Sequence, residues 1–324
     1  MADKASETRI TDLNNLPADS VARAGDKRFA GFLLNDDGAE RWARAARDRV
    51  FAEIETLGLI ANVGELEMKG YTALTPEQVG PPAFIDQLRE TIIALAEKRS
   101  GQAIDRASGV TFEDDNSPYG QVHSLFGLFG EDPIFEQALM HRPMLALVTY
   151  LLGESCFLHH ERAAIKGPGD QYLPMHADPS GPTPYPWISQ VCNTTFALTD
   201  HTIESGTTCF VPGSHRLCRQ PTREEAMDLS SFVPLEVPAG SLIVWHGNSW
   251  HGALPRKQPG IRVSLVQYFS RPSAASDVPR NFNSVVTPEM LARNPPRFAT
   301  LLGVDDPTLR LESFKAQRTG YSFC

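Results

Sequence analysis

The sequence contains no apolar run of the ~20 residues that a bilayer-spanning helix needs, which excludes a membrane-spanning protein. Residues 1–20 are polar and lack the apolar core of a secretory signal, so we expect a cytoplasmic protein. The five cysteines are odd in number and form no CxxC pair, which argues against a disulfide framework and a thiolate zinc site. Positive charge is also scarce, because 30 Lys and Arg stand against 39 Asp and Glu. We therefore expect a small-molecule substrate and no nucleic-acid or membrane partner, while the oligomeric state stays open.

Helical patterns dominate the first part of the 324-residue chain. Apolar spacing predicts helices over residues 40–57, 84–101 and 133–152, with Pro143 at the first turn of a new helix. Two short helices are expected near the other end, at residues 287–293 and 296–302.

From residue 156 onward, short runs of β-branched and aromatic residues alternate with turn residues. The predicted strands cover residues 188–198, 207–211, 241–245 and 261–269. In the last strand, one face would carry Ile261, Val263, Leu265 and Gln267, and the other Arg262, Ser264, Val266 and Tyr268. The pattern predicts a mainly β fold with α-helices, as one domain over residues 1–324. Within it we expect a largely helical part, a β-barrel core and an irregular end, at residues 1–155, 156–271 and 272–324.

His176 and Asp178 form a His-x-Asp pair. In extended backbone, residues i and i+2 point the same way, so an imidazole and a carboxylate can converge on one metal ion. By itself the pair also suits a surface turn, since Pro179 follows it directly.

A second segment, residues 240–252, contains His246 and His251, and Arg262 follows on the last predicted strand. One imidazole from here would complete a set of two His and one carboxylate. Such a set leaves three positions of an octahedral ion open and suits non-haem iron(II), although zinc also accepts these ligands. A buried Arg262 would need an anion, either a dicarboxylate cosubstrate or a structural Asp or Glu.

Taken together, these blocks resemble the phytanoyl-CoA dioxygenase family of iron(II)- and 2-oxoglutarate-dependent oxygenases. The resemblance rests on an ordered set of matches: His176-x-Asp178, the segment from Asn193 to Thr208, the run Val211-Pro-Gly-Ser-His215, His251 and Arg262. It implies a double-stranded β-helix, a jelly-roll or cupin-like barrel, with the N-terminal helices packed on one side.

The resemblance also implies roles for individual residues. His176, Asp178 and His251 would be catalytic ligands of Fe(II), with 2-oxoglutarate and O2 as cosubstrates. Arg262 would pair with the distal carboxylate of 2-oxoglutarate, supported by Thr208.

Many relatives have a glutamine shortly before the first ligand, where this sequence has Leu173 and Pro174. Gln190 is our cosubstrate-binding candidate in its place, and Gln171 is the other. Structural roles are expected for His215 and His246. They are also expected for His159 and His160, because adjacent residues of a regular strand point to opposite faces.

The resemblance further implies the reaction. 2-Oxoglutarate would become succinate and CO2 while a small organic metabolite or natural-product intermediate is oxidised, by hydroxylation in the simplest case. The carboxylate of Asp178 favours oxygenation over halogenation. Desaturation, cyclisation, endoperoxide formation and an acyl-CoA substrate remain open. So do a cupin-type metal enzyme without 2-oxoglutarate and a non-catalytic barrel. Substrate contacts are expected from residues 68–72, 114–123, Phe126 and the Pro-rich loop 179–187.

Overall fold

The computed structural model of the chain describes residues 39–109, 122–170, 172–179, 181–274 and 285–304. The chain divides into two units, residues 1–49 and 50–324. Of the first unit, the structure describes only the start of helix α2 (Ala39–Thr56), and every element below belongs to the second. Gln171 and most of the expected contact segment 114–123 lie outside the described residues.

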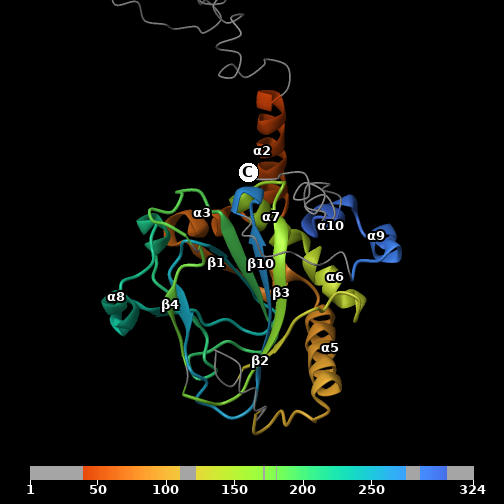
Figure 1. Ribbon diagram of the computed structural model, residues 1–324, viewed down its shortest axis with the longest axis vertical. Helices are drawn as coiled ribbons and strands as arrows, with labels where there is room; N and C mark the ends of the chain where they lie inside the picture. The colour runs from red at the N-terminus through yellow and green to blue at the C-terminus, as the bar shows by residue number, and fades with distance from the viewer. Residues whose placement is uncertain (1–38, 110–121, 171, 180, 275–284, 305–324) are drawn as a thin grey trace, which may run out of the picture. The chain divides into compact units, whose positions relative to one another are not determined.

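Two antiparallel sheets form the centre of the second unit (Figure 1). The larger sheet has the strand order β1 (Tyr71–Leu74), β8 (Leu242–His246), β5 (Val191–Ala197), β10 (Arg262–Ser270), β3 (Phe157–Lys166) and β2 (Val122–Leu125). The smaller sheet has the order β4 (Leu173–His176), β9 (His251–Ala253), β6 (Thr208–Phe210) and β7 (Val233–Pro234). Phe210 of β6 stacks on Tyr71 of β1 with ring centroids 4.2 Å apart, so the two sheets face each other as walls of a barrel. The predicted jelly-roll barrel is confirmed.

Helices such as α7 and α10 pack on the larger sheet, whereas α8 contacts β4 of the smaller sheet. In Figure 1, α5 and α6 lie to the right of the sheet, and β4 and α8 lie to the left. The helices are α3 (Ile60–Lys69), α4 (Pro76–Val79), α5 (Pro82–Ser100), α6 (Pro133–Leu139), α7 (Arg142–Leu152), α8 (Arg223–Met227), α9 (Pro288–Arg293) and α10 (Pro296–Leu301). Pro143 lies in the first turn of α7, as expected, because a proline there lacks only an N–H that has no helical partner. Within the described residues, no helix is both long and apolar enough to span a bilayer.

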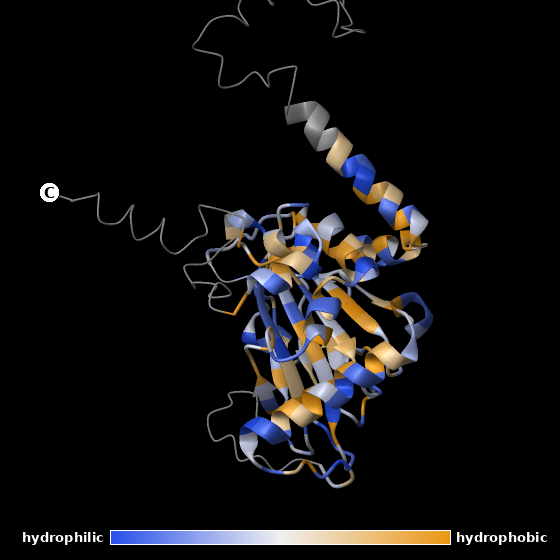
Figure 2. Cartoon of the chain, turned by 90° about the vertical axis from the view of Figure 1, so that its right-hand side faces the viewer, coloured by the Kyte–Doolittle hydropathy of each residue, from blue (hydrophilic) through white to orange (hydrophobic). Residues whose placement is uncertain are grey.

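Strand β10 shows why the two faces of the larger sheet differ. Val263, Leu265 and Phe269 are fully buried in the main core with the helices. Arg262 and Tyr268 have the opposite parity and point into the barrel, as the predicted alternation requires. Figure 2 shows this mixture as apolar and polar segments that alternate along the central strands.

The region expected to be largely helical also contributes two strands, β1 and β2, at opposite edges of the larger sheet. Each has only four residues, which is too short for a periodic pattern to stand out in the sequence. These edge strands widen the sheet against which the helices pack.

Candidate metal and cosubstrate site

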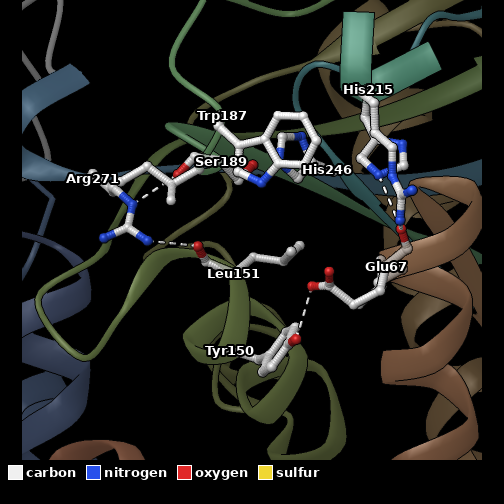
Figure 3. A pocket seen from close by; sticks show the side chains of 11 residues that line it. Glu67, Tyr150, Leu151, Trp187, Ser189, His215, His246 and Arg271 are labelled. Atoms are coloured by element: carbon white, nitrogen blue, oxygen red, sulfur yellow. Dashed lines mark hydrogen bonds between the residues drawn. The ribbon is translucent and has the colours of Figure 1, made fainter. Parts of the chain in front are cut away.

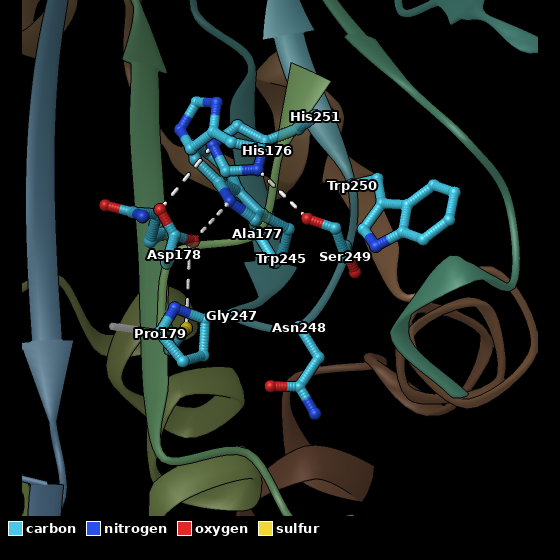
Figure 4. Close-up of polar contacts among 12 residues, drawn as sticks. His176, Ala177, Asp178, Pro179, Trp245, Gly247, Asn248, Ser249, Trp250 and His251 are labelled. Atoms are coloured by element: carbon cyan, nitrogen blue, oxygen red, sulfur yellow. Dashed lines mark hydrogen bonds and ion pairs between the residues drawn. The ribbon is translucent and has the colours of Figure 1, made fainter. Parts of the chain in front are cut away.

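Strands β4 and β9 bring the predicted triad together. They pair antiparallel, and His176 stands directly opposite His251 in their register. The two imidazole rings have centroids 4.4 Å apart, and Nε2 of His251 lies 3.6 Å from Oδ1 of Asp178. One ligand atom from each of the three residues falls within 4.8 Å of the others (Figure 4). This spacing lets all three side chains contact a single ion.

Backbone carbonyls fix how both imidazoles are turned. Nδ1 of His176 lies 2.8 Å from the carbonyl oxygen of Pro174, and Nδ1 of His251 lies 3.0 Å from that of Ser249. A carbonyl only accepts, so each Nδ1 carries the proton and each Nε2 keeps a free lone pair. Histidines that bind metals are typically oriented in this way by the group behind them.

Asp178 is buried and held by two neighbouring strands. Nε1 of Trp245 donates to Oδ2 of Asp178 over 3.2 Å, and the Asn193 side chain bonds to the same carboxylate. Burial raises the pKa of Asp178 above its ordinary value, although His176 and these hydrogen bonds oppose the shift. Burial also lowers the pKa of His251 to about 4, so this imidazole is neutral at pH 7. A buried carboxylate beside neutral imidazoles is a strong cation site.

A pair of buried cations lies at another position of the barrel. Lys166 of β3 and Arg262 of β10 stand directly opposite each other, with 7% and 9% of their surface exposed. Arg262 donates to the carbonyl of Gly206, and Lys166 donates to that of Leu254 over 2.5 Å. Within the described residues neither forms an ion pair, and Nε of Arg262 has no hydrogen-bond partner. Two buried cations without a carboxylate form a site for an anion.

The pKa values of Lys166 and Arg262 are both lowered because the two cations are buried and close to other positive charges. Burial is the main cause that lowers the pKa of Lys166 to about 7 and that of Arg262 to about 10. Repulsion adds to the shift, since Arg262 and Arg256 both act on Lys166. An anion would relieve the repulsion and replace the lost water.

The cation pair is connected to the triad through β9. Leu254, which accepts from Lys166, comes three residues after His251, so the two sites lie roughly 10 Å apart along extended chain. Thr208 and Phe210 are two residues apart on β6, so their side chains lie on the same face, which is the barrel face. The ring of Phe210 stacks on the imidazole of His251, with the two centroids 6.1 Å apart. In the register of β6 and β9, Thr208 stands opposite Ala253, between His251 and Leu254 in the chain, and its role toward the cosubstrate stays a prediction.

Gln190 precedes β5, and its amide donates to the carbonyl of Ile188 over 3.2 Å. Its assignment to the cosubstrate stays a prediction. His215 and His246 lie near each other, with centroids 5.3 Å apart, beside a separate cavity of about 240 Å³. Figure 3 shows this cavity between Tyr150, Trp187 and Arg271.

Sequence reasoning missed Lys166, Trp245 and the link from Asn193 to Asp178. Lys166 ends a strand that was not predicted, although the apolar Ala163 and Ile165 alternate with it. That alternation could have placed Lys166 on the barrel face. The contact of Trp245 with Asp178 had no signal, because it depends on how β8 lies against the chain after β4.

Comparisons with known proteins match this chain to a described family. Residues 66–264 match a family described as phytanoyl-CoA dioxygenase. A dioxygenase from Aspergillus fumigatus, af480, is 27% identical over 207 residues, which cover 61% of this chain and 66% of that relative. Phytanoyl-CoA dioxygenase 1 from Oryza sativa is 37% identical over 81 residues, 21% of this chain and 29% of that protein. The chain thus matches just under two thirds of the fungal relative's length.

Solved structures share the fold. HygX from Streptomyces hygroscopicus, crystallised with nickel and 2-oxoglutarate, has a TM-score of 0.52 at 14% identity, covering 66% of this chain and 87% of its own. SnoK, a non-haem carbocyclase of nogalamycin biosynthesis that depends on α-ketoglutarate, has a TM-score of 0.50 at 21% identity, covering 71% and 91%.

Proposed function

The chain belongs to the phytanoyl-CoA dioxygenase family of iron(II)- and 2-oxoglutarate-dependent oxygenases, and we propose that it hydroxylates a small organic metabolite or natural-product intermediate. The observation that carries the proposal is the convergence of His176, Asp178 and His251 on one point, with both Nε2 atoms unprotonated. Iron(II) in such a site, with O2 and 2-oxoglutarate, supplies oxidation of a substrate C–H bond while 2-oxoglutarate becomes succinate and CO2.

The residues of the triad fit this ion. Two neutral imidazoles and one carboxylate occupy one face of an octahedral ion and leave three positions for exchangeable ligands. The carboxylate of Asp178 neutralises part of the ion's charge, and Trp245 and Asn193 hold it in place. Since the ligand position of Asp178 is filled by a carboxylate, the proposal is oxygenation and not halogenation.

We propose that Arg262 and Lys166 together bind the distal carboxylate of 2-oxoglutarate. Both are buried, both lack a carboxylate partner within the described residues, and the unpaired Nε of Arg262 is available to a ligand. A five-carbon dicarboxylate has the reach to span from the triad to this pair, and Thr208, the register partner of Ala253, would support the same carboxylate. Charge-assisted hydrogen bonds to a guanidinium and an ammonium would fix the orientation of the cosubstrate.

The proposal is tested with protein loaded anaerobically with Fe(II) and then supplied with 2-oxoglutarate, O2 and a panel of small organic molecules. We expect substrate-dependent succinate formation, and none from the His176→Ala variant. His215→Gln, which changes a histidine outside the triad, should keep the activity. Full turnover by His176→Ala would refute the metal assignment. Turnover that does not require 2-oxoglutarate would favour a different metal enzyme.

A further inference from the structure

A β-bulge places two adjacent histidines on the same side of strand β3. Tyr268 of β10 pairs with His160, but the next residue, Phe269, pairs with Leu158, so His159 is the extra residue. The two imidazole centroids are 5.5 Å apart, and their Nδ1 atoms are 3.3 Å apart. The expectation that these side chains point to opposite faces was therefore wrong, because it assumed a regular strand.

The register of the larger sheet connects these histidines to the metal site. Directly opposite residues on neighbouring strands present their side chains on the same face. Trp245 pairs with Asn193, Asn193 with Tyr268, and Tyr268 with His160. This row crosses four strands on the barrel side. Its first two members hold the carboxylate of Asp178, so Tyr268 and His160 continue directly from the metal site.

The rings of His159, His160 and Tyr268 pack into one cluster, which we call the ring wall. His160 and Tyr268 stack with centroids 5.1 Å apart and planes 10° apart, while His159 meets Tyr268 edge-on at 5.3 Å. Phe126, which is 54% exposed, packs edge-on against His160 at 6.4 Å. The three wall residues are only half-buried, in contrast to the fully buried residues on the helix side of the same strands.

Two residues of the ring wall, His160 and Tyr268, are uncharged at neutral pH. Burial is the main cause that lowers the pKa of His160 to about 4, and the neighbouring His159 and Arg162 contribute to the same shift. Burial together with the nearby Asp178 raises the pKa of Tyr268 above its ordinary value, so its phenol keeps its proton. The flat rings of this surface offer dispersion and quadrupole contacts to another ring.

We propose that His159, His160 and Tyr268 form the substrate-contacting wall beside the metal, and that it selects a planar, unsaturated ring over a saturated one of the same size. The proposal rests on the proposed function, because it assigns a substrate class to that oxidation site. A planar ring can lie flat or edge-on against the wall, as the wall's own rings do against each other. A puckered saturated ring has no π face of its own, so it cannot form a stacked or edge-to-face aromatic pair with the wall.

The test uses nickel(II)-loaded protein with saturating 2-oxoglutarate and two probes of matched size, 2-naphthol and decahydro-2-naphthol, titrated by calorimetry. We expect the wild-type protein to bind 2-naphthol about tenfold more tightly than the saturated alcohol. His160→Leu and Tyr268→Leu should lose this preference, whereas His160→Phe should keep it. Phe51→Leu removes an exposed aromatic side chain outside the barrel and should change nothing.

Equal binding of the two probes by the wild type, no binding of either, or an undiminished preference in both leucine variants would overturn the proposal. The affinity for 2-oxoglutarate, measured on the same samples, shows whether each variant still has a folded barrel. A protein that prefers 2-naphthol but forms no succinate with Fe(II) would contradict the proposed function and leave the ring preference standing. A protein that forms succinate with Fe(II) but shows no ring preference would contradict the ring preference and leave the proposed function standing.

Discussion

Lys166 and Arg262 form a register pair of β3 and β10, so two buried cations face the barrel side by side. Their like charges are unfavourable in the free protein and favourable once a carboxylate lies between them. If the pair binds an anion as proposed, it lowers the stability of the ligand-free barrel and raises its affinity for that anion.

The Lys166→Met variant tests this exchange. A hydrogen bond to a charged group contributes about 1.5–3 kcal/mol, so 2-oxoglutarate should bind at least about tenfold more weakly. The ligand-free variant should melt at the same or a higher temperature than wild type, because the repulsion and the buried charge are gone. Calorimetric titration of the nickel-loaded protein and thermal unfolding without ligand measure the two effects. Lys166→Arg, which keeps the charge, serves as control, and unchanged affinity in Lys166→Met would contradict the role.

The pKa of Lys166 predicts how pH acts on both properties. In the folded protein it is lowered to about 7, from an unfolded value near 10.4, so between these values the unfolded chain binds the extra proton. The stability of the ligand-free protein should therefore rise with pH above about 7, as the penalty of the buried charge disappears.

Binding of 2-oxoglutarate should weaken over the same range, because the ammonium is needed to hold the carboxylate. In the lower part of this range, up to about pH 9, the other groups near Lys166 do not titrate. His201 has its pKa lowered well below its ordinary value by burial, burial raises the pKa of Cys209 to about 11, and Arg262, whose pKa is about 10, and Arg256 stay mostly charged. Titrations at several pH values should show this weakening in wild type and not in Lys166→Met.

Trp245→Phe removes the indole N–H that holds Asp178 while keeping an aromatic ring in the barrel. Groups that orient a metal ligand typically change affinity or activity 10–100-fold, so we expect iron(II) to bind about tenfold more weakly. Equilibrium dialysis of the metal measures this loss. Trp187→Phe, at an exposed tryptophan, is the matched control, and equal iron affinity in the two variants would argue against an orienting role for Trp245.

Gly206→Ala tests the backbone segment whose carbonyl accepts a hydrogen bond from Arg262. Gly206 has a φ of +77°, and an added Cβ would lie 2.6 Å from the carbonyl oxygen of Leu254, which accepts from Lys166. We expect a loss of more than about 1 kcal/mol in the free energy of unfolding, together with weaker 2-oxoglutarate binding.

The control for this variant is Gly58→Ala, whose φ is +67° but whose Cβ would meet nothing within 4 Å. It isolates backbone strain from the steric clash. Chemical denaturation and titration of 2-oxoglutarate should separate the two glycines, and equal effects on cosubstrate binding would show that the carbonyls near Gly206 do not position the cation pair.

Local patterns in the sequence were enough for several features of this site. The two-residue alternation along β10 correctly placed Val263 and Leu265 on one face and Arg262 on the other, and the structure shows that the first face is the core face. The spacing of His176 and Asp178 was sufficient to place their side chains on one side of the chain. Gln190 stays a predicted cosubstrate contact, and the hydrogen bond described for its side chain goes to the nearby carbonyl of Ile188.

Other features depended on which strands pair and in what register. That His251 stands opposite His176, that Lys166 stands opposite Arg262, and that Trp245 reaches Asp178 all follow from contacts between distant segments. The bulge at His159 reversed the direction expected for one side chain, and no pattern in the neighbouring sequence predicts a bulge there.

The sequence by itself determined which side chains share a face of each strand, because a strand's side-chain period of two is a local property of extended backbone. Only the tertiary structure decided which faces meet across the barrel. Strand pairing and bulges are set by hydrogen bonds and packing between residues far apart in the chain, and these give the metal triad, the cation pair and the ring wall their common interior.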